Sequence, residues 1–359
     1  MQDFFKKIAS CLYGAAVKLR HLLFDINILR SEKFKIPIIC VGNVTVGGTG
    51  KTPVVEMLVR HYSDRYNVAV LSRGFGRKTK GYRVVETTDV YTEVGDEPLQ
   101  IKRKFPNVTV VVCEKRAYAI HRIQKEFPNV NMILMDDGFQ HRYVDPLINI
   151  VVVDHNRPPY RDHLLPYGDL RDVKSSLYRA HYFIVTKCPA VMKPITMREY
   201  RQMAEKPAQG LFFASTHFEA PIPVFANVEG TVEPKAKVIA MSGIGNPKAF
   251  NEALKQRYKV VGTLDFSDHH IYHMSDLARM LEMVEKYPDA MIMTTEKDAV
   301  KLSNSAAIPE NLRRKMFYEK ISISLLPTPP AINNSSDTLF ERIDKDIKNK
   351  DNGTFIRGL

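Results

Sequence analysis

A glycine-rich segment near residue 45 has the residue types that hold a nucleotide phosphate. An apolar stretch ends at Val41 and is followed by Gly42-Asn43-Val44-Thr45-Val46-Gly47-Gly48-Thr49-Gly50-Lys51-Thr52-Pro53. Glycines let successive backbone N–H groups turn inward around phosphate oxygens, and a helix that starts after the loop adds a favourable dipole. Lys51 would reach the β- and γ-phosphates, and the Thr52 hydroxyl would bind Mg²⁺. The expected phosphate ligands are Thr45, Gly47, Gly48, Thr49, Gly50, Lys51 and Thr52.

The segment departs from the usual phosphate-loop pattern at one position. In G-x-x-x-x-G-K-[ST] the first glycine would stand where this chain has Thr45. The Gly-Lys-Thr triplet, the extra Gly47-Gly48 and the strand–loop–helix context still predict a phosphate loop. A plain glycine turn, the alternative, does not explain Lys51 and Thr52 at the start of a helix.

A second segment predicts a magnesium-binding carboxylate. The apolar run Met132–Met135 leads into Asp136-Asp137-Gly138-Phe139-Gln140-His141. An acidic residue at the end of a strand beside the phosphate loop binds Mg²⁺ directly or through water. Adjacent residues of a strand face opposite sides, so we expect one of Asp136 and Asp137 to meet the metal. The alternative is a simple Asp-Asp-Gly turn.

The elements that position these residues alternate between strands and helices. Short apolar runs, many apolar on both faces, are typical of a parallel sheet covered by helices. The expected strands are 36–41, 68–72, 108–113, 132–135, 148–154 and 182–186. With amphipathic helices between several of them, the chain is predicted to form a doubly wound, mostly parallel α/β fold of the P-loop type.

Four parts of the chain are expected. Residues 1–35 form an amphipathic helix, and residues 36–218 form the nucleotide-binding domain, whose boundary can lie as early as about 155. Pro221 and Pro223 mark Glu219–Val224 as a linker, and residues 219–330 then form a second, smaller α/β domain. Residues 331–359 are a polar tail that we expect to be frayed.

Composition limits the classes of protein. Of 359 residues 44% are apolar, which is enough for packed cores, and the formal charge is +12. Such a charge attracts phosphates, nucleic acid or an anionic membrane, and does not choose among them. The four cysteines lack CxxC spacing and are expected to be buried, reduced thiols of a cytosolic protein. No cleavable signal peptide is visible, and no run approaches the roughly 18 apolar residues of a membrane span.

The N-terminal segment Phe4–Leu29 is unusual. Phe and Leu residues recur there at helical spacing, and Lys and Arg residues interleave with them. A helix with a basic face and a Phe/Leu face can lie in the plane of a bilayer interface. The pattern alone equally permits a helix that packs on its own domain.

The motifs together resemble one family. Gly-Asn-x-x-x-Gly-Gly-Thr-Gly-Lys-Thr-Pro, Leu71–Arg77, Gly95–Pro98 and Asp136–His141 occur in one order, as they do in the tetraacyldisaccharide 4'-kinase family. Later segments match as well, namely Phe266-Ser267-Asp268-His269-His270 and Thr294-Thr295-Glu296-Lys297-Asp298-Ala299-Val300. That family likewise lacks the first glycine of the loop, and the resemblance extends to about residue 325.

The resemblance implies a reaction and its partners. The γ-phosphate of ATP, with Mg²⁺, would pass to the 4'-hydroxyl of a tetraacylated glucosamine disaccharide 1-phosphate. The acylated acceptor favours the membrane-surface interpretation of the N-terminal helix. It also implies a peripheral protein at the cytoplasmic face of the inner membrane of a Gram-negative-type bacterium. Neither nucleic acid nor an obligate protein partner is expected.

The resemblance also assigns roles to three residues. Gly95-Asp96-Glu97-Pro98 alone is an ordinary turn. By resemblance, Asp96 is the catalytic aspartate that accepts the proton of the sugar hydroxyl. His269 is its partner, which orients it or relays its proton, and Glu97 is a carboxylate near Mg²⁺. Lys51 completes the expected catalytic set.

Other polar residues are candidates for substrate binding. Arginines at strand ends suit phosphate through their fork geometry, although solvated or salt-bridged arginines are common on surfaces. The candidates are Arg73, Arg77, Arg116, Gln140 and His141. His269-His270 has no third ligand at zinc spacing, so no structural metal is expected. Thr294–Asp298 either lines the cleft or caps a helix.

Two rival functions differ in class. A P-loop GTPase or metallochaperone reads guanine through Asn-Lys-x-Asp, where this chain has Thr186-Lys187-Cys188-Pro189. A nucleotide-gated membrane-binding module would leave Asp96 and His269 without a role. The kinase interpretation accounts for all of these residues.

Overall fold

The computed structural model describes residues 2–305 and 307–351. A twelve-stranded sheet runs through the whole molecule in the order β12-β11-β13-β14-β10-β9-β8-β2-β6-β3-β5-β4. Its strands are β2 (Ile38–Gly42), β3 (Val68–Ser72), β4 (Arg83–Val84), β5 (Thr109–Val112), β6 (Met132–Asp136), β8 (Ile148–Asp154), β9 (Tyr182–Cys188), β10 (Gly210–Pro223), β11 (Lys237–Ser242), β12 (Lys259–Asp265), β13 (Met291–Thr295) and β14 (Met316–Leu325). Two short strands, β1 (Glu32–Lys33) and β7 (Val144–Asp145), pair separately.

The helices are α1 (Gln2–Asp25), α2 (Lys51–Tyr62), α3 (Tyr91–Val94), α4 (Asp96–Lys104), α5 (Arg116–Glu126), α6 (Pro194–Glu199), α7 (Pro247–Lys255), α8 (Met274–Lys286), α9 (Glu296–Leu302), α10 (Glu310–Arg313), α11 (Pro330–Asn333) and α12 (Leu339–Asp351). Within the large sheet, only the β4–β5 and β10–β14 pairs of the described residues are antiparallel. The predicted mostly parallel α/β fold is therefore confirmed.

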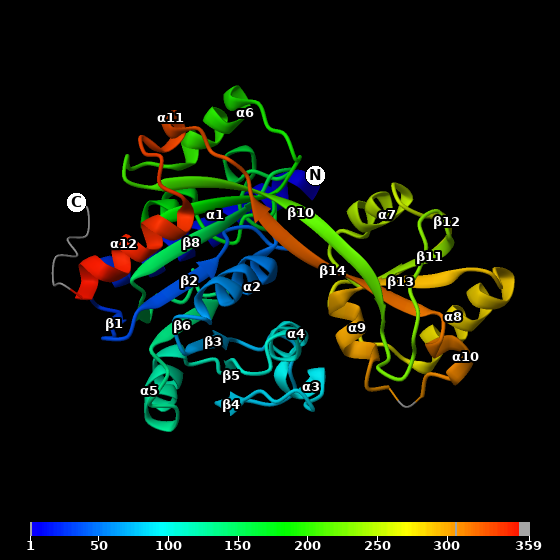
Figure 1. Cartoon of the computed structure of the whole chain (residues 1–359). Coiled ribbons are helices and arrows are strands. Elements are labelled where there is room, and N and C mark those ends of the chain that lie inside the picture. The colour runs from blue at the N-terminus through cyan, green and yellow to red at the C-terminus, as the bar shows by residue number, and fades with distance from the viewer. Residues whose placement is uncertain (1, 306, 352–359) are drawn as a thin grey trace.

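The molecule has two lobes joined by a long antiparallel ribbon. Figure 1 shows β10 and β14 running from the large lobe, which carries α2, α4 and α5, to the small lobe, which carries α7 to α10. The predicted linker Glu219–Val224 is wrong, because β10 continues to Pro223 and pairs with β14. Prolines weaken a strand, and the register indeed shifts between Phe218 and Pro221. The predicted boundary at residue 218 thus falls inside a strand.

The expectation of a frayed tail is also wrong as far as residue 351. Leu339, Ile343 and Ile347 recur at helical spacing along α12 and are buried in the core that also holds α2. Tyr62 of α2 donates a hydrogen bond to Asp344 at 3.1 Å. The sequence did not predict this helix, because most of its residues are polar and only a narrow apolar face packs against the core. Residues 352–359 lie outside the described part.

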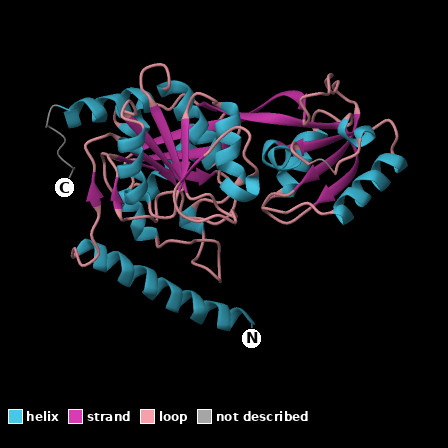
Figure 2. Ribbon diagram, turned by 90° about the horizontal axis from the view of Figure 1, so that it is seen from below, coloured by secondary structure: helices cyan, strands magenta, loops and turns pink. Residues whose placement is uncertain are grey.

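Three of the four cysteines are buried as predicted, whereas Cys11 is exposed on α1. Figure 2 shows α1 lying along one side of the large lobe, apart from the sheet. None of the helices in residues 2–305 and 307–351 is both long and apolar enough to cross a membrane.

Candidate active site

The phosphate loop joins β2 to α2 and has the backbone shape its glycines predict. Gly47 and Gly50 have positive φ angles of 84° and 88°, which side chains disfavour. The Asn43 amide donates to the Thr45 carbonyl at 2.7 Å and to the Thr49 hydroxyl at 2.8 Å. These bonds fix the loop from inside.

The structure gives a reason for threonine in place of the usual first glycine. Thr45 forms an antiparallel bridge with Leu170, and it is absent from the described residues with positive φ. An extended backbone does not require glycine. The loop is supported from β9 as well, where the Lys187 ammonium donates to the Gly48 carbonyl at 2.6 Å and to Asp154 at 2.7 Å.

Asp136 and Asp137 leave the end of β6 in different environments. Asp136 is fully buried, and its Oδ1 has no hydrogen-bond partner in the described part of the chain. Burial, with the negative charges of Glu97 and Asp137, raises the pKa of Asp136 to about 7. A buried carboxylate with a free oxygen and an unfavourable charge fits a bound cation.

Asp137 faces the phosphate loop. Its φ is 47°, and its carboxylate is held by the Arg171 fork and lies 3.8 Å from the Lys51 ammonium. Burial opposes its ionisation, but Lys51 and Arg171 outweigh burial and lower the pKa of Asp137 to about 2. Of these two aspartates, Asp136 is therefore the one that retains an unsatisfied oxygen for a metal.

The residues fit Mg²⁺ rather than a metal held by protein ligands alone. No group of three or more His, Cys, Asp or Glu side chains in the described residues could hold an ion. Mg²⁺ does not need such a cage, because it keeps several waters and takes one or two carboxylates plus substrate phosphates. Asp136 and Glu97 would supply those carboxylates.

Asp96 and His269 meet across the two lobes. Asp96 starts α4 after Gly95, whose φ is 95°, and His269 has a φ of 56° on the loop after β12. His269 Nδ1 lies 3.0 Å from Asp96 Oδ2. Because the two residues are 173 positions apart, only the folded chain brings them together.

Two lysines of α9 surround this pair. The Lys297 ammonium lies 3.0 Å from His269 Nε2 and 3.7 Å from Asp96, and the Lys301 ammonium lies 3.7 Å from Asp96. A lysine ammonium only donates, so Nε2 accepts and His269 donates to Asp96 from Nδ1. Burial opposes ionisation of Asp96, but His269 and Lys297 outweigh burial and lower its pKa to about 2.

Of the predicted arginines, Arg77 has a different environment from Arg73 and Arg116. Arg77 is paired with Glu114 at 2.5 Å and donates to the Gly81 carbonyl, so its guanidinium is bonded to neighbouring loops of the large lobe. Arg116 is buried, and burial with the nearby Arg73 lowers its pKa, while Asp136 and Asp137 oppose the shift. Arg73 and Arg116 therefore lie together near the carboxylates of β6.

Gln140 and His141 follow the same strand. Gln140 donates to the Asn43 carbonyl at 2.7 Å, which ties it to the phosphate loop. Burial, with Arg116, Arg20 and Arg73, lowers the pKa of His141 to about 4. His141 is thus a neutral imidazole within a cluster of positive charge.

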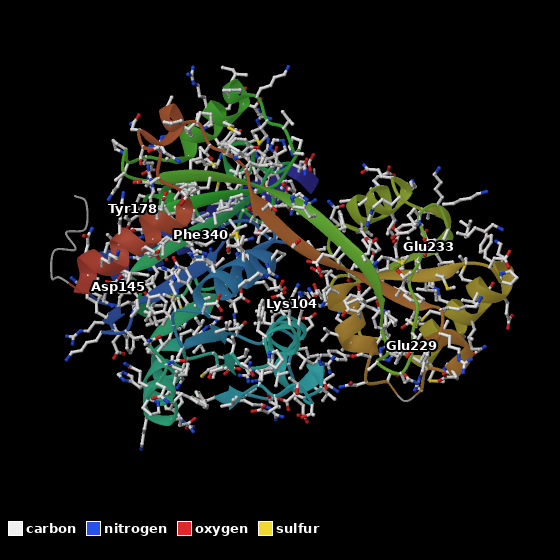
Figure 3. The ribbon with its side chains drawn as sticks, in the orientation of Figure 1. Lys104, Asp145, Tyr178, Glu229, Glu233 and Phe340 are labelled. Atoms are coloured by element: carbon white, nitrogen blue, oxygen red, sulfur yellow. The ribbon has the colours of Figure 1, made fainter. Side chains whose placement is uncertain are left out.

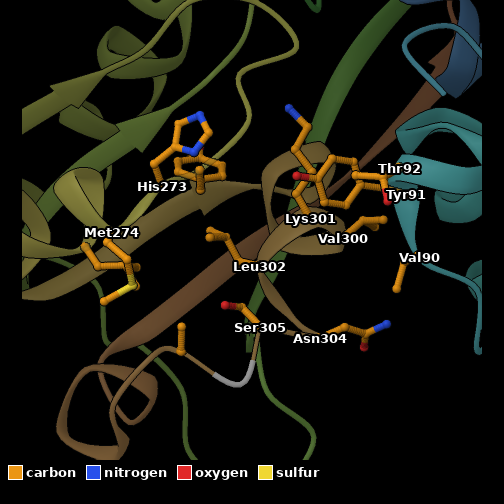
Figure 4. Close-up of a pocket in the computed structure, with 13 residues that line it drawn as sticks. Val90, Tyr91, Thr92, His273, Met274, Val300, Lys301, Leu302, Asn304 and Ser305 are labelled. Atoms are coloured by element: carbon orange, nitrogen blue, oxygen red, sulfur yellow. The ribbon is translucent and has the colours of Figure 1, made fainter. Parts of the chain in front are cut away.

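A cavity of about 450 Å³ lies beside the Asp96 cluster, between α3 and the small lobe. Figure 4 shows Tyr91 and Thr92 on one wall and His273 and Leu302 on the other, with Lys301 between them. No phosphate-loop residue lines it. Lys301 both lines this cavity and lies beside Asp96, so the cavity adjoins the Asp96 cluster.

Sequence patterns missed four residues of the site: Asn43, Arg171, Lys297 and Lys301. Asn43 and Lys297 stood inside matched motifs without an assigned role. Arg171 lies in a short charged loop, and nothing in the sequence indicates its pairing with Asp137, which lies 34 positions away. Thr295–Asp298 begins a helix, because the Thr295 hydroxyl accepts from the Asp298 N–H, and the same helix brings Lys297 to Asp96 and His269.

A buried ion cluster joins the lobes beside the site. Lys104 lies 2.6 Å from Glu56 and 3.2 Å from Glu296, and Figure 3 places Lys104 where the lobes meet. Burial and the charge of Glu56 raise the pKa of Glu296 from its ordinary 4.5 to about 7. The positive charges of Lys104 and Lys320 do not offset burial and the charge of Glu56.

This shift predicts the effect of Glu296→Gln. The folded chain binds a proton at Glu296 more tightly than the unfolded chain, so stability falls as pH rises from 4.5 to about 7. Glu296→Gln should therefore raise the unfolding temperature by a few degrees at pH 8 and have little effect at pH 4.5. Calorimetry at both pH values measures this, with Glu310→Gln, at the exposed start of α10, as the control. A lower unfolding temperature at pH 8 would show that the Lys104 contact outweighs the repulsion.

Comparison with known proteins matches most of the chain to one family of kinases. Residues 3–341 match the model of the family described as tetraacyldisaccharide-1-P 4'-kinase. The chain is 40% identical over 329 residues to the tetraacyldisaccharide 4'-kinase of Porphyromonas gingivalis, covering 89% of this chain and 92% of the relative. It is 37% identical over 355 residues to that of Phocaeicola vulgatus, covering 96% of each.

A solved structure that contains ATP is similar in fold. The crystal structure of LpxK from Aquifex aeolicus in complex with ATP superposes with a TM-score of 0.73 at 26% identity, covering 98% of this chain and 99% of that one. The family match, the relatives and the superposition span both lobes and α1. The chain therefore belongs to the tetraacyldisaccharide-1-P 4'-kinase family.

Proposed function

We propose that this protein transfers the γ-phosphate of ATP to the 4'-hydroxyl of a tetraacylated glucosamine disaccharide 1-phosphate. The observation that carries the proposal is the contact of Asp96 with His269, beside the lysines of α9. A P-loop binding module or GTPase needs no such pair between two lobes. The acceptor is taken from the names of the family and its relatives.

Each polar residue then has a role. The N–H groups of Gly47–Gly50 and the Lys51 ammonium bind the phosphates, and Lys51 neutralises charge that develops during transfer. Thr52, Asp136 and Glu97 would hold Mg²⁺, which when bound neutralises phosphate oxygens. Arg73 and Arg116 supply positive charge on the acceptor side.

Asp96 accepts the proton of the attacking hydroxyl. With a pKa of about 2 it stays ionised through the physiological range, although it is a weak base. Phosphoryl transfer passes through a loose transition state, in which a carboxylate of this kind orients the hydroxyl and takes its proton. His269 is occupied at Nε2 by Lys297 in this arrangement, so its role is to orient Asp96 rather than to relay a proton.

Acceptor-dependent release of ADP tests this function. Purified protein should consume ATP when the lipid acceptor is present and should consume much less without it. GTP should be a poor substitute. GTP consumption that is faster than ATP consumption and independent of the acceptor would favour the GTPase class instead.

The outward face of α1 supports attachment to a membrane surface. Phe4, Phe5, Leu12 and Leu19 are more than half exposed, and so is Leu22 one turn further on. A row of exposed apolar side chains of this length is unusual on a protein surface that faces water. The flanking lysines suit anionic headgroups. The opposite face of α1 packs on the large lobe, so packing on its own domain leaves the outward face available for the proposed membrane contact.

Replacing the outward residues should release the protein from membranes. We expect Phe5→Ser with Leu12→Ser and Leu19→Ser to reduce flotation with anionic liposomes to near background. Each of the three apolar side chains contributes roughly 1.5–3 kcal/mol when it enters the bilayer, so together they change the partition constant by at least about 10³-fold. Raising the salt concentration should weaken the remaining binding. Val191→Ser is the control, since Val191 is 87% exposed but lies outside α1. Equal flotation of all variants would remove α1 as the anchor.

A further inference from the structure

The inward face of α1 is bonded to residues 163–172, a segment that we call the strap. The Ser10 hydroxyl donates to the Leu164 carbonyl at 2.8 Å, and the Tyr13 hydroxyl donates to the Arg171 carbonyl at 2.8 Å. A Cβ on Gly14 would come within 2.8 Å of the Leu164 side chain, so the helix approaches the strap closely at a glycine.

A second contact closes the other end of the strap. His21 is buried, and its Nε2 lies 2.6 Å from Asp172 Oδ1. Arg142 donates to His21 Nδ1 at 3.1 Å, so Nε2 carries the hydrogen that Asp172 accepts. Asp172 also lies 3.3 Å from Arg179. This buried network fixes the strap against α1 over more than two helical turns.

The other edge of the strap holds the phosphate loop. The N–H of Val46 donates to the Asp169 carbonyl at 2.8 Å, and the N–H of Arg171 donates to the Val44 carbonyl at 2.8 Å. With the Thr45–Leu170 bridge, the first half of the loop is paired with the strap as in a short antiparallel ladder.

The Arg171 side chain extends the same connection to the carboxylates. Its guanidinium bonds to Asn43 Oδ1 and to both oxygens of Asp137. Asn43 in turn fixes Thr45 and Thr49 within the loop. Tyr13 thus bonds to the backbone of Arg171, the same residue whose guanidinium holds Asp137.

We propose that Tyr13 and His21 are positioning residues for the nucleotide site, acting through the strap and Arg171. The helix whose outer face suits a bilayer holds, with its inner face, the loop that binds phosphate. Seating α1 and binding ATP are therefore linked. This inference rests on the proposed nucleotide site but not on the identity of the acceptor. Deleting α1 is a poor test of membrane binding, because it also removes Tyr13 and His21.

The test compares the two faces of one helix in the full-length protein. Tyr13→Phe and His21→Asn remove inward hydrogen bonds, and Leu12→Ser and Leu19→Ser alter the outward face. The dissociation constant of a non-hydrolysable ATP analogue is measured by titration calorimetry in detergent, and liposome flotation and the unfolding temperature are measured in parallel.

Variants on the two faces of α1 should affect different properties, nucleotide affinity for the inward face and liposome flotation for the outward face. We expect each inward variant to weaken nucleotide binding about three- to tenfold, the range for one lost buried hydrogen bond, with flotation unchanged. The KM for ATP should rise and the KM for acceptor should not. The outward variants should lose flotation and keep the wild-type dissociation constant. Arg171→Lys, which keeps the charge but loses the fork, should weaken nucleotide binding at least as much.

Opposite outcomes overturn the proposal. Wild-type nucleotide affinity in Tyr13→Phe and His21→Asn, with only the unfolding temperature lowered, would make these contacts purely stabilising. Equal weakening by inward and outward variants would show a general effect of α1. A wild-type protein that binds the analogue but phosphorylates no lipid would contradict the proposed acceptor while leaving the affinity comparison valid.

Discussion

Replacing Lys51 with alanine should abolish phosphoryl transfer and leave the protein folded. Lys51 starts α2 directly after the glycines, and its ammonium lies 3.8 Å from Asp137 at the mouth of the loop. The charge it contributes is most valuable where negative charge develops during transfer. The loss in turnover should be at least on the order of 10²–10³-fold, the range for removal of one transition-state donor.

The measurement is the turnover of purified Lys51→Ala with saturating acceptor, alongside its thermal unfolding curve. Lys125→Ala, on the exposed side of α5, is the matched control and should have wild-type turnover. A Lys51→Ala protein with wild-type turnover would mean that this loop does not hold the transferred phosphate.

Asp96 and His269 should behave as one unit. Loss of either residue should lower turnover by about 10²–10⁴-fold, the usual contribution of a positioned acid or base. Since His269 acts through Asp96, Asp96→Ala with His269→Ala should be scarcely slower than the worse single variant. ATP affinity should be similar in all three proteins, because neither residue belongs to the phosphate loop.

The double-mutant comparison has a direct control. His217→Ala changes an exposed histidine of β10 and should leave turnover unaltered. Losses that multiply fully in the double variant would show that Asp96 and His269 work independently. In that case the 3.0 Å contact would be a structural hydrogen bond between lobes.

Local patterns predicted the elements whose signals are local. The strands around the phosphate loop are apolar on both faces, so β3 and β8 have the expected bounds, and the other predicted strands differ by a few residues. The glycines before Lys51 likewise predict a phosphate loop, and the Asp pair after Met135 predicts a magnesium ligand, each from a few neighbouring residues. The pairing of Asp96 with His269 was predicted from the family resemblance, which rests on the motifs and their order. Nothing in the spacing of these two residues indicates that they meet.

The remaining features depend on contacts between distant segments. Pro221 and Pro223 indicate a linker locally, yet pairing with β14 keeps both in a strand that spans the lobes. The apolar face of α12 is narrow and becomes evident only against α2. Arg171 acquires its role because the strap pairs with the phosphate loop, and a charged loop in the sequence gives no sign of that pairing.

The most direct test of the account is the chemistry of the lipid product. Purified protein is incubated with ATP, Mg²⁺ and the tetraacylated disaccharide 1-phosphate, and the lipid is analysed by tandem mass spectrometry. The account predicts one added phosphate on the 4' oxygen of the distal glucosamine, formed by the wild type and not by Asp96→Ala or Lys51→Ala. An unmodified lipid, or a phosphate added equally well by Asp96→Ala, would contradict it.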